Sequence, residues 1–230
     1  MRKITVALLF GGRSNEHDVS LQSGYAAAAH MDPEKYEVLL IGITRDGRWF
    51  RYTGDLENVR LGRWASDAAY CVPVALPLGR PYGKLLELRP GGGTVELAVD
   101  IVLPALHGRN GEDGTLQGLL ELAGIPYAGC GVLSSALCMD KDRAHKLAAL
   151  EGIRVPASVV LGRHVPQEEW LAWTSSLSWP RMVKPVRSGS SIGISLARGP
   201  AELPQAVAAA FEHDKAVIVE EYIEGVEVGC

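Results

Sequence analysis

The segment from Lys184 to Gly193 carries the densest set of residues that could do chemistry. It reads KPVRSGSSIG, a lysine at the end of an apolar run followed by serines and glycines. The lysine supplies a cation, and the small residues supply hydroxyls and backbone N–H donors that can close over phosphate oxygens. A solvent-exposed hairpin turn has a similar composition, so these residues alone leave a phosphate loop and a plain turn equally open.

A second group of candidates is acidic. The apolar run Val217–Val219 leads into Glu220 and Glu221, and two more glutamates follow at Glu224 and Glu227. Carboxylate oxygens are acceptors that suit ribose hydroxyls or the amine of adenine. The solvated face of an edge strand would show the same pattern, and both interpretations stay open on the sequence.

Two further candidates follow short apolar runs. Glu16 lies in GGRSNEHDVS, just after a glycine turn and near the start of a predicted helix. Its carboxylate could pair with a substrate ammonium, while the helix N-terminus would favour a substrate carboxylate. The neighbouring Ser14 and Asp18 have a simpler explanation as helix caps. His107, in LHGR, is either a site imidazole or a structural histidine.

Buried strands precede both of these candidates. Apolar runs predict strands at Ile4–Phe10, Tyr36–Ile43 and Val99–Leu106, and a helix is expected from Glu16 to His30. Strand, helix and strand in this order predict a Rossmann-like α/β domain with a parallel sheet and a right-handed crossover. Ligands of such sheets lie outside the carboxyl ends of the strands, where both glycine-flanked loops are expected.

The rest of the chain is predicted from weaker signals. Residues 54–80 look irregular, and Lys84–Leu88 with Thr94–Val99 predict a β-hairpin around a glycine-rich turn. The sequence changes character between residues 130 and 140, where we place a domain boundary. Alternating helices and strands are predicted beyond it, at 142–151, 159–161, 168–173, 181–186, 201–211 and 216–222.

Composition and charge exclude several classes of protein. The chain has 230 residues, 47% hydrophobic and 22% charged, which is typical of a globular protein. Its net charge of -4 supplies no basic field for a nucleic acid backbone. No apolar stretch approaches the ~20 residues that span a bilayer, and the apolar run after Met1 is too short for a signal peptide. We therefore expect neither a nucleic acid partner nor a membrane, and a cytoplasmic location.

The cysteines fit a reducing compartment. They form no CxxC pair and stand far apart, at Cys71, Cys130, Cys138 and Cys230. Such sparse use predicts neither a disulfide framework nor a cysteine metal site.

Taken together, the candidate segments resemble the D-alanine–D-alanine ligase family of the ATP-grasp superfamily. Each segment alone is a weak signal, but all occur in family order and extend over essentially the whole chain. The matching segments are GGRSNEHDVS (11–20), LHGRNGEDGTLQG (106–118), SSALCMDKDRAHK (134–146), VKPVRSGSSIG (183–193) and VEEYIEGVEVG (219–229).

The resemblance implies both an architecture and an activity. Residues 1–135 would form the substrate-binding domain, 136–215 the first ATP-grasp subdomain, and 216–230 the start of a second, truncated α+β subdomain. The activity would be ATP-dependent joining of D-alanine to a second D-amino acid for peptidoglycan precursor synthesis. ATP first phosphorylates one D-alanine carboxylate, and the amine of the second substrate then attacks the acyl phosphate. Phosphoryl transfer of this kind needs alignment and charge neutralisation more than a strong base.

The family motifs also imply roles for single residues. Glu16 would hold the ammonium of the first D-alanine, His107 would lie beside that substrate, and Ser190 would help to position it. Glu16 and Ser190 are therefore the expected catalytic residues. Phosphates, adenine and ribose of ATP would be bound by Lys141, Lys184, Ser188, Gly189, Ser191, Glu220, Glu221, Tyr222, Ile223 and Glu227.

Part of the family pattern is missing from the chain. The Mg²⁺ ligands of the family lie in an acid–x–Asn segment, which we expect beyond residue 230, so no metal ligand is assigned here. The loop that selects the second substrate is also absent. We therefore expect a partly represented protein, and no ligation by these 230 residues alone.

Variants within the motifs resemble the vancomycin-resistance branch of the family. This branch makes D-Ala–D-Ser or D-Ala–D-lactate, so we rank D-serine above D-alanine as second substrate and D-lactate third. Ligases of the family are commonly homodimers. A catalytically silent nucleotide- or amino-acid-binding module is the alternative of another class, and a downstream acid–x–Asn segment would decide for the enzyme.

Overall fold

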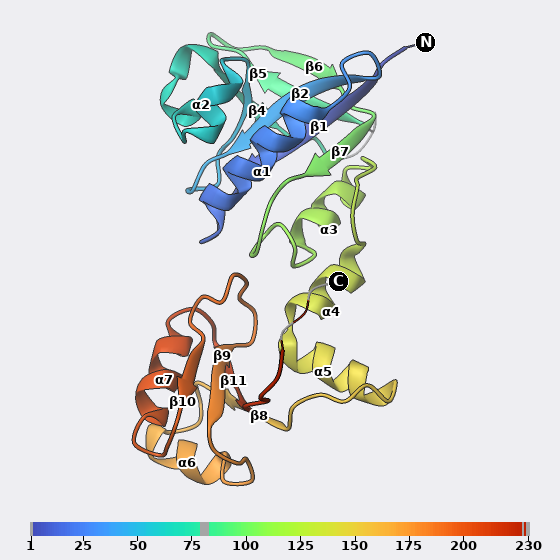
Figure 1. Ribbon diagram of the computed structural model, residues 1–230. Helices are drawn as coiled ribbons and strands as arrows, with labels where there is room; N and C mark the ends of the chain where they lie inside the picture. Colours follow the sequence, from blue (N-terminus) through green and yellow to red (C-terminus); the bar gives the residue numbers. More distant parts are fainter. Residues whose placement is uncertain (1, 79–82, 227, 229–230) are drawn as a thin grey trace. The chain divides into compact units, whose positions relative to one another are not determined.

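The computed structural model describes residues 2–78, 83–226 and 228 (Figure 1). The chain divides into two compact units, Met1–Ala136 and Leu137–Cys230. Helix α4 (Val132–Met139) runs from the first unit into the second. Each unit has its own sheet and its own hydrophobic core.

The first unit contains a mixed sheet in the order β6-β5-β4-β3-β2-β1-β7. β1 pairs in parallel with both β2 and β7, and every other neighbouring pair is antiparallel. The expected parallel arrangement is therefore confirmed only for β1, β2 and β7; the sheet as a whole is mixed, and its antiparallel part includes the predicted hairpin, which is β5 with β6. The strands are β1 (Ile4–Gly11), β2 (Tyr36–Ile43), β3 (Trp49–Tyr52), β4 (Cys71–Ala75), β5 (Lys84–Leu88), β6 (Thr94–Ala98) and β7 (Ile101–Pro104).

The lengths of the connections explain why some strands of the sheet are parallel and others antiparallel. Helix α1 (His17–His30) lies between β1 and β2 and supplies the crossover that parallel strands need. Between β2 and β3 only a short turn is present, in which the Thr44 N–H donates to the Arg48 carbonyl at 2.9 Å. Such a turn reverses the chain, so the following strands pair as hairpins.

Residues 54–78 are more ordered than the sequence predicts. They contain α2 (Leu56–Arg60), two short 3₁₀ turns (Trp64–Ser66 and Ala68–Tyr70) and β4. The Asp55 carboxylate accepts from the Glu57 N–H at 3.0 Å and caps α2. Elements this short carry too little periodicity to be recognised, so the expectation of an irregular segment is wrong.

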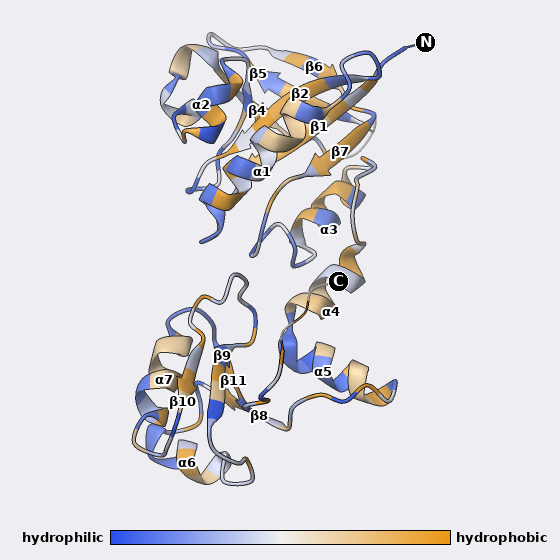
Figure 2. Cartoon of the chain, in the orientation of Figure 1, coloured by the Kyte–Doolittle hydropathy of each residue, from blue (hydrophilic) through white to orange (hydrophobic). Residues whose placement is uncertain are grey.

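Neighbouring residues of β1 face opposite sides of the sheet. Leu9 packs with Leu116 and Leu120 of α3 (Thr115–Leu122), while Phe10 packs with Leu21 of α1. Because side chains alternate along a strand, one apolar run supplies both cores. β1 is accordingly hydrophobic along most of its length (Figure 2).

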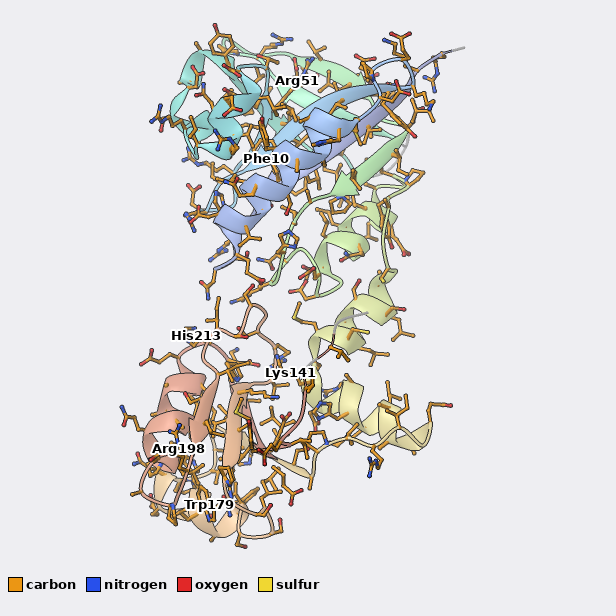
Figure 3. The ribbon with its side chains drawn as sticks, in the orientation of Figure 1. Phe10, Arg51, Lys141, Trp179, Arg198 and His213 are labelled. Atoms are coloured by element: carbon orange, nitrogen blue, oxygen red, sulfur yellow. The ribbon has the colours of Figure 1, made fainter. Side chains whose placement is uncertain are left out.

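One ion-pair cluster interrupts the apolar face that α3 covers. The Glu87 side chain is only 1% exposed, and its Oε1 lies 2.5 Å from Arg51 Nη1 of β3. Arg89 contacts the other oxygen of the same carboxylate. Arg51 is labelled in Figure 3. A buried carboxylate without such partners would be strongly destabilising.

The second unit contains an antiparallel sheet in the order β10-β9-β11-β8. Its core consists of one face of this sheet, helix α7 and Trp170, whereas α5 contributes no buried residue. The short strand β10 is missing from the sequence prediction. The elements are α5 (Lys141–Leu150), β8 (Ser158–Gly162), a 3₁₀ turn (Gln167–Glu169), α6 (Trp170–Trp173), β9 (Arg181–Pro185), β10 (Ser195–Ala197), α7 (Leu203–Phe211) and β11 (Ala216–Glu221).

Among the described residues, no helix is both long and apolar enough to cross a membrane.

Two glycines of the first unit provide a matched test of its packing. A Cβ at Gly42 of β2 would lie 2.4 Å from ring atoms of Trp64, whereas a Cβ at Gly118 of α3 would meet nothing within 4 Å. We expect Gly42→Ala to lower the free energy of unfolding by about 1–3 kcal/mol because the core cannot take the extra atom. Gly118→Ala should raise it by about 0.5–1 kcal/mol, because glycine is costly inside a helix.

The measurement is urea unfolding of each variant, followed by tryptophan fluorescence. An unchanged midpoint for Gly42→Ala would show that the Trp64 ring can move aside, contrary to this prediction.

Candidate functional site

The first candidate site lies at the carboxyl ends of β1 and β7. These strands run parallel side by side, and the chain leaves β1 toward β2 through α1. In open α/β sheets, ligands bind where the chain leaves two neighbouring strands in different directions. The loops that follow the two strands carry Glu16 and His107, the residues predicted from the sequence.

Glu16 is largely buried, at 9% exposure, and its position is fixed by contacts between the two loops. The Glu16 N–H donates to Ser14 Oγ at 3.1 Å, and the Ser14 hydroxyl donates to the His107 carbonyl at 2.9 Å. Ser14 thus joins the loops, and Glu16 itself occupies the N-cap position of α1 without a side-chain cap bond.

The Glu16 carboxylate packs directly on the backbone of Gly108. A Cβ at Gly108 would lie 1.9 Å from Glu16 Oε2, and this glycine has a φ of +66°. A larger residue would therefore be excluded both by the carboxylate and by its own backbone conformation.

His107 is oriented by a contact of one ring nitrogen. Its Nε2 lies 2.8 Å from Ser23 Oγ of α1, while its Nδ1 lies 3.7 Å from Glu112 Oε1, beyond hydrogen-bond distance. The imidazole is partly exposed. His17, which the sequence prediction missed, is buried with Nδ1 2.7 Å from the Gly12 carbonyl and supports the glycine turn.

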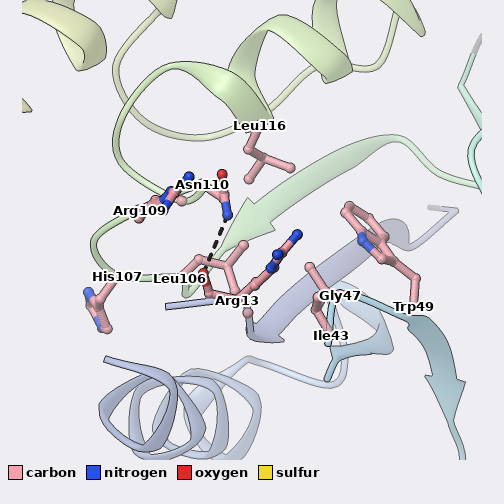
Figure 4. Close-up of a pocket in the computed structure, with 11 residues that line it drawn as sticks. Arg13, Ile43, Gly47, Trp49, Leu106, His107, Arg109, Asn110 and Leu116 are labelled. Atoms are coloured by element: carbon pink, nitrogen blue, oxygen red, sulfur yellow. Dashed lines mark hydrogen bonds between the residues drawn. The ribbon is translucent and has the colours of Figure 1, made fainter. Parts of the chain in front are cut away.

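A pocket of about 230 Å³ adjoins the same loop (Figure 4). Arg13, Trp49 and Leu106 lie among its lining residues, and Asn110 Nδ2 donates to the Arg13 carbonyl at 3.3 Å. The His107 ring is turned away from Arg13 and Trp49. His107 is also one of the lining residues, so the pocket belongs to the first candidate site.

The second candidate site is centred on Glu220 of β11. This side chain is only 1% exposed, and its Oε2 lies 2.6 Å from Lys184 Nζ on the neighbouring strand β9. The other oxygen, Oε1, lies 3.6 Å from His145 Nδ1 of α5. Among the described residues, neither Oε1 nor this nitrogen has a hydrogen-bond partner.

Lys141, the first residue of α5, connects this cluster to the loop 188–193, the serine loop. Its Nζ donates to the Ser188 carbonyl at 2.6 Å, and its backbone N–H donates to the Val186 carbonyl at 3.1 Å. Burial lowers the pKa of the Lys141 ammonium, and the like charge of Lys184 lowers it further. Lys141 is labelled in Figure 3.

The loop from Ser188 to Gly193 connects β9 to β10 and ends in a strained turn. Ser190 and Ser191 both have positive φ values, 47° and 55°, and the Ile192 N–H donates to the Gly189 carbonyl at 3.1 Å. This is the geometry of a type I′ turn, which usually takes glycine or asparagine. The Ser188 hydroxyl donates to the Ile192 carbonyl at 3.4 Å. The loop joins two antiparallel strands, which is compatible with both interpretations of its composition.

Asp214 anchors the base of this loop. Its carboxylate accepts from the Arg187 backbone N–H at 2.8 Å and from Arg187 Nη2 at 2.8 Å, while the Lys215 N–H donates to it at 2.6 Å. Burial alone would raise the pKa of the Asp214 carboxyl, but these hydrogen bonds outweigh burial and lower it.

The structure does not gather all the predicted nucleotide residues around Glu220. Glu221 accepts from Ser178 Oγ at 3.2 Å, and the Tyr222 N–H donates to the Pro180 carbonyl at 3.1 Å. The side chains of Tyr222 and Ile223 are exposed. Glu227 lies outside the described residues.

Comparisons with known proteins place these two sites in context. Residues 5–130 match the family model "D-ala D-ala ligase N-terminus", and residues 147–230 match "D-ala D-ala ligase C-terminus". The chain belongs to the D-alanine–D-alanine ligase family.

Individual members of the family agree with this assignment. A D-alanine–D-alanine ligase of Caldicellulosiruptor bescii is 43% identical, over 100% of this chain and 63% of that protein. The crystal structure of the VanG D-Ala:D-Ser ligase from Enterococcus faecalis superposes with a TM-score of 0.88 at 46% identity, over 97% of this chain and 64% of that one.

A third relative was solved with nucleotide. The D-alanine–D-alanine ligase of Bacillus anthracis complexed with ATP gives a TM-score of 0.66 at 29% identity, over 96% of this chain and 60% of that one. The chain therefore spans less than two thirds of the length of each of these three ligases.

His145 and Asp214 lie in the second candidate site and were missed by the sequence interpretation. His145 stands four residues after Lys141, so it lies one helical turn away on the same face of α5. That spacing is a signal the sequence does contain. Asp214 has no comparable signal, because its role depends on the packing of its loop against Arg187.

The lowered pKa of Asp214 predicts a pH-dependent contribution to stability. A carboxylate with a depressed pKa stabilises the folded state above its usual 3.8, and this stabilisation is lost as the pH falls through the lowered value. We expect Asp214→Asn to lower the melting temperature at pH 7, and the difference from wild type to shrink below pH 3.8.

The measurement is thermal unfolding between pH 2 and pH 8. The control is Glu212→Gln, which changes an exposed carboxylate in the same region. A difference between wild type and Asp214→Asn that is constant over the whole pH range would contradict the assignment.

Proposed function

We propose that the protein is an ATP-dependent ligase that joins D-alanine to a second D-amino acid through an acyl phosphate. One observation carries the proposal. Lys141, Lys184, Glu220 and the serine loop, which are far apart in the sequence, form one cluster in the unit that matches the ligase C-terminus. Cations beside small residues and a buried acceptor suit a nucleoside triphosphate.

In the proposed nucleotide site, Lys141 and Lys184 neutralise phosphate oxygens. Lys184 reaches those oxygens by sharing or leaving its contact with Glu220, and the serine loop covers them and excludes water. Glu220 Oε1, buried and without a hydrogen-bond partner among the described residues, fits the amine of adenine. Because the Tyr222 N–H already bonds to Pro180, adenine would use other backbone groups of this segment.

In the proposed amino acid site, the Glu16 carboxylate holds the ammonium of the first D-alanine. Its burial strengthens this ion pair, because little water screens a charge at 9% exposure. His107, oriented by Ser23, lies beside the substrate. We propose that Ser190 positions the same substrate from the serine loop.

The proposed reaction has two steps. A carboxylate oxygen of D-alanine attacks the γ-phosphorus, the bond from this phosphorus to the β,γ-bridging oxygen breaks, and ADP leaves. The neutral amine of the second substrate then attacks the acyl carbon and forms a tetrahedral intermediate. Loss of the amine proton and expulsion of phosphate complete the peptide bond. Alignment and charge neutralisation supply most of the catalysis in phosphoryl transfer.

The residues present do not form a Mg²⁺ site. No group of three or more His, Cys, Asp or Glu side chains that could hold a metal ion occurs in the described part of the chain. Hard cations such as Mg²⁺ take oxygen ligands, chiefly carboxylates and phosphates. We therefore assign no step to the metal and no metal ligand among the described residues.

D-serine is the second substrate we propose first. The VanG ligase, with 46% identity and a TM-score of 0.88, is described as a D-Ala:D-Ser ligase. D-alanine ranks second, in line with the name of the Caldicellulosiruptor bescii relative. D-lactate ranks third. The proposed location is the cytoplasm, where peptidoglycan precursors are made, and the proposed assembly is a homodimer.

The decisive experiment uses the complete protein encoded by the reading frame that contains this chain. Phosphate release and dipeptide formation are measured with D-alanine plus D-serine, D-alanine or D-lactate between pH 6 and pH 9. An amine nucleophile must lose its proton, so its rate rises with pH more steeply than that of a hydroxyl. No ATP-dependent product with any pair would overturn the proposed function and leave a binding module.

Lys184→Ala tests the phosphate site in that assay. Removing a cation that neutralises transferring phosphate should lower phosphate release about 10²-fold or more. Lys146→Ala is the matched control, because Lys146 lies on α5 with a side chain 71% exposed and pairs only with Asp142 among the described residues. Turnover of Lys184→Ala close to that of wild type would remove this lysine from the site.

Glu16→Gln tests the amino acid site. Loss of the charge that holds the ammonium should raise the KM for the first D-alanine about 10-fold or more, while the ATP affinity stays nearly constant. Gly108→Ala should have the same effect, since its Cβ would displace the Glu16 carboxylate. The exposed Glu34, changed to Gln, is the control. An equal loss of affinity for ATP and D-alanine would count against this role.

A further inference from the structure

Two buried polar atoms of the second unit face each other across a short gap. His145 Nδ1 and Glu220 Oε1 are 3.6 Å apart, beyond hydrogen-bond distance. Both are buried, and neither has a hydrogen-bond partner among the described residues. Buried polar groups are rarely left unsatisfied, and exceptions often mark the place of a missing ligand or water.

The neighbouring contacts keep this pair of atoms open. Lys184 Nζ lies 2.6 Å from the other carboxylate oxygen of Glu220, so Oε2 has a cationic partner while Oε1 has no hydrogen-bond partner among the described residues. Lys141, one turn before His145, is engaged with the Ser188 carbonyl at 2.6 Å.

The two atoms together offer complementary hydrogen bonds to one kind of ligand edge. An ionised carboxylate only accepts, and a neutral imidazole with its proton on Nδ1 donates from that nitrogen. A ligand that satisfies both must present a donor to Glu220 and an acceptor to His145. Adenine does so, because its exocyclic amine donates and the adjacent ring nitrogen accepts. Guanine and hypoxanthine carry a carbonyl oxygen in place of the amine, and that oxygen would face the carboxylate.

We propose that His145 is a specificity-determining residue that, together with Glu220, selects adenine over 6-oxopurines. The inference rests on the proposed function, because it requires a purine nucleotide at this site. The inference assigns the discrimination between adenine and 6-oxopurines to the His145 imidazole on α5, a helix that has no buried residue. A histidine that only packs or pairs with Glu220 would change the stability of the unit and would not change which base is bound.

The test compares ATP with inosine triphosphate, which differs from ATP in carrying a carbonyl oxygen and a protonated N1. The dissociation constant of each nucleotide is measured by competition with a fluorescent ADP analogue, using the complete protein and its His145→Leu and His145→Gln variants. His145→Leu should weaken ATP about 10-fold and leave inosine triphosphate within about 2-fold, because only adenine uses the donor. His145→Gln, whose amide can donate, should recover most of the ATP affinity.

His164→Leu is the matched control, since that imidazole is exposed on the loop after β8. It should leave both affinities unchanged, and circular dichroism checks the folding of every variant. Equal weakening of the two nucleotides by His145→Leu, or no weakening of either, would overturn the inference.

The outcomes separate this inference from the proposed function. A wild-type protein that makes product with ATP, and whose preference for ATP survives His145→Leu, refutes only the role of His145. A wild-type protein that binds no nucleotide refutes both.

Discussion

Carboxylates removed from water need a cation close by, and this requirement organises both units of the chain. Glu87 lies against Arg51, Glu220 against Lys184, and Asp214 against Arg187. An unpaired carboxylate at such burial would be strongly destabilising, so the partners must arrive together for the structure to form. Each pair also joins segments far apart in the sequence. In the second unit, these contacts hold the strands and the serine loop that form the candidate nucleotide site.

The first unit depends on close approach of backbone more than on ion pairs. The Glu16 carboxylate occupies the space that a Cβ of Gly108 would need, and a Cβ at Gly11 would lie 2.3 Å from the Ile43 carbonyl. Glycine at position 108 lets the loops after β1 and β7 approach each other, and glycine at position 11 lets the end of β1 approach the end of β2. The first candidate site thus combines a buried carboxylate with closely packed loops that contain glycine.

The sequence predicts the helices and strands that have a strong local pattern. It does not predict those that depend on contacts between distant residues. The apolar runs of β1 and β2 and the helix α1 are confirmed, because long apolar runs and a helix after a glycine turn are local signals. The antiparallel half of the sheet follows from short turns, and β10 exists only because it pairs with β9. The family resemblance identified Glu220 and Lys184 as candidate nucleotide-binding residues, but no pattern in the sequence indicated that their side chains contact each other. Strand alternation, however, already separates Glu220 from Glu221, because neighbours on a strand point to opposite faces.

The cluster around Glu87 has a consequence for how β5 finds its place in the sheet. The strand reads KLLEL, with Leu85 and Glu87 on the face that α3 covers and leucines at the intervening positions. A slip by one residue would present Leu86 and Leu88 to that core instead, and by apolar content alone the slipped pairing would be at least as good. Arg51 on β3 distinguishes the two, because only the observed pairing gives its charge a partner. The alignment of this hairpin is therefore encoded by the ion pairs of Glu87, and a fully apolar replacement of the cluster would free the strand to pair in two ways.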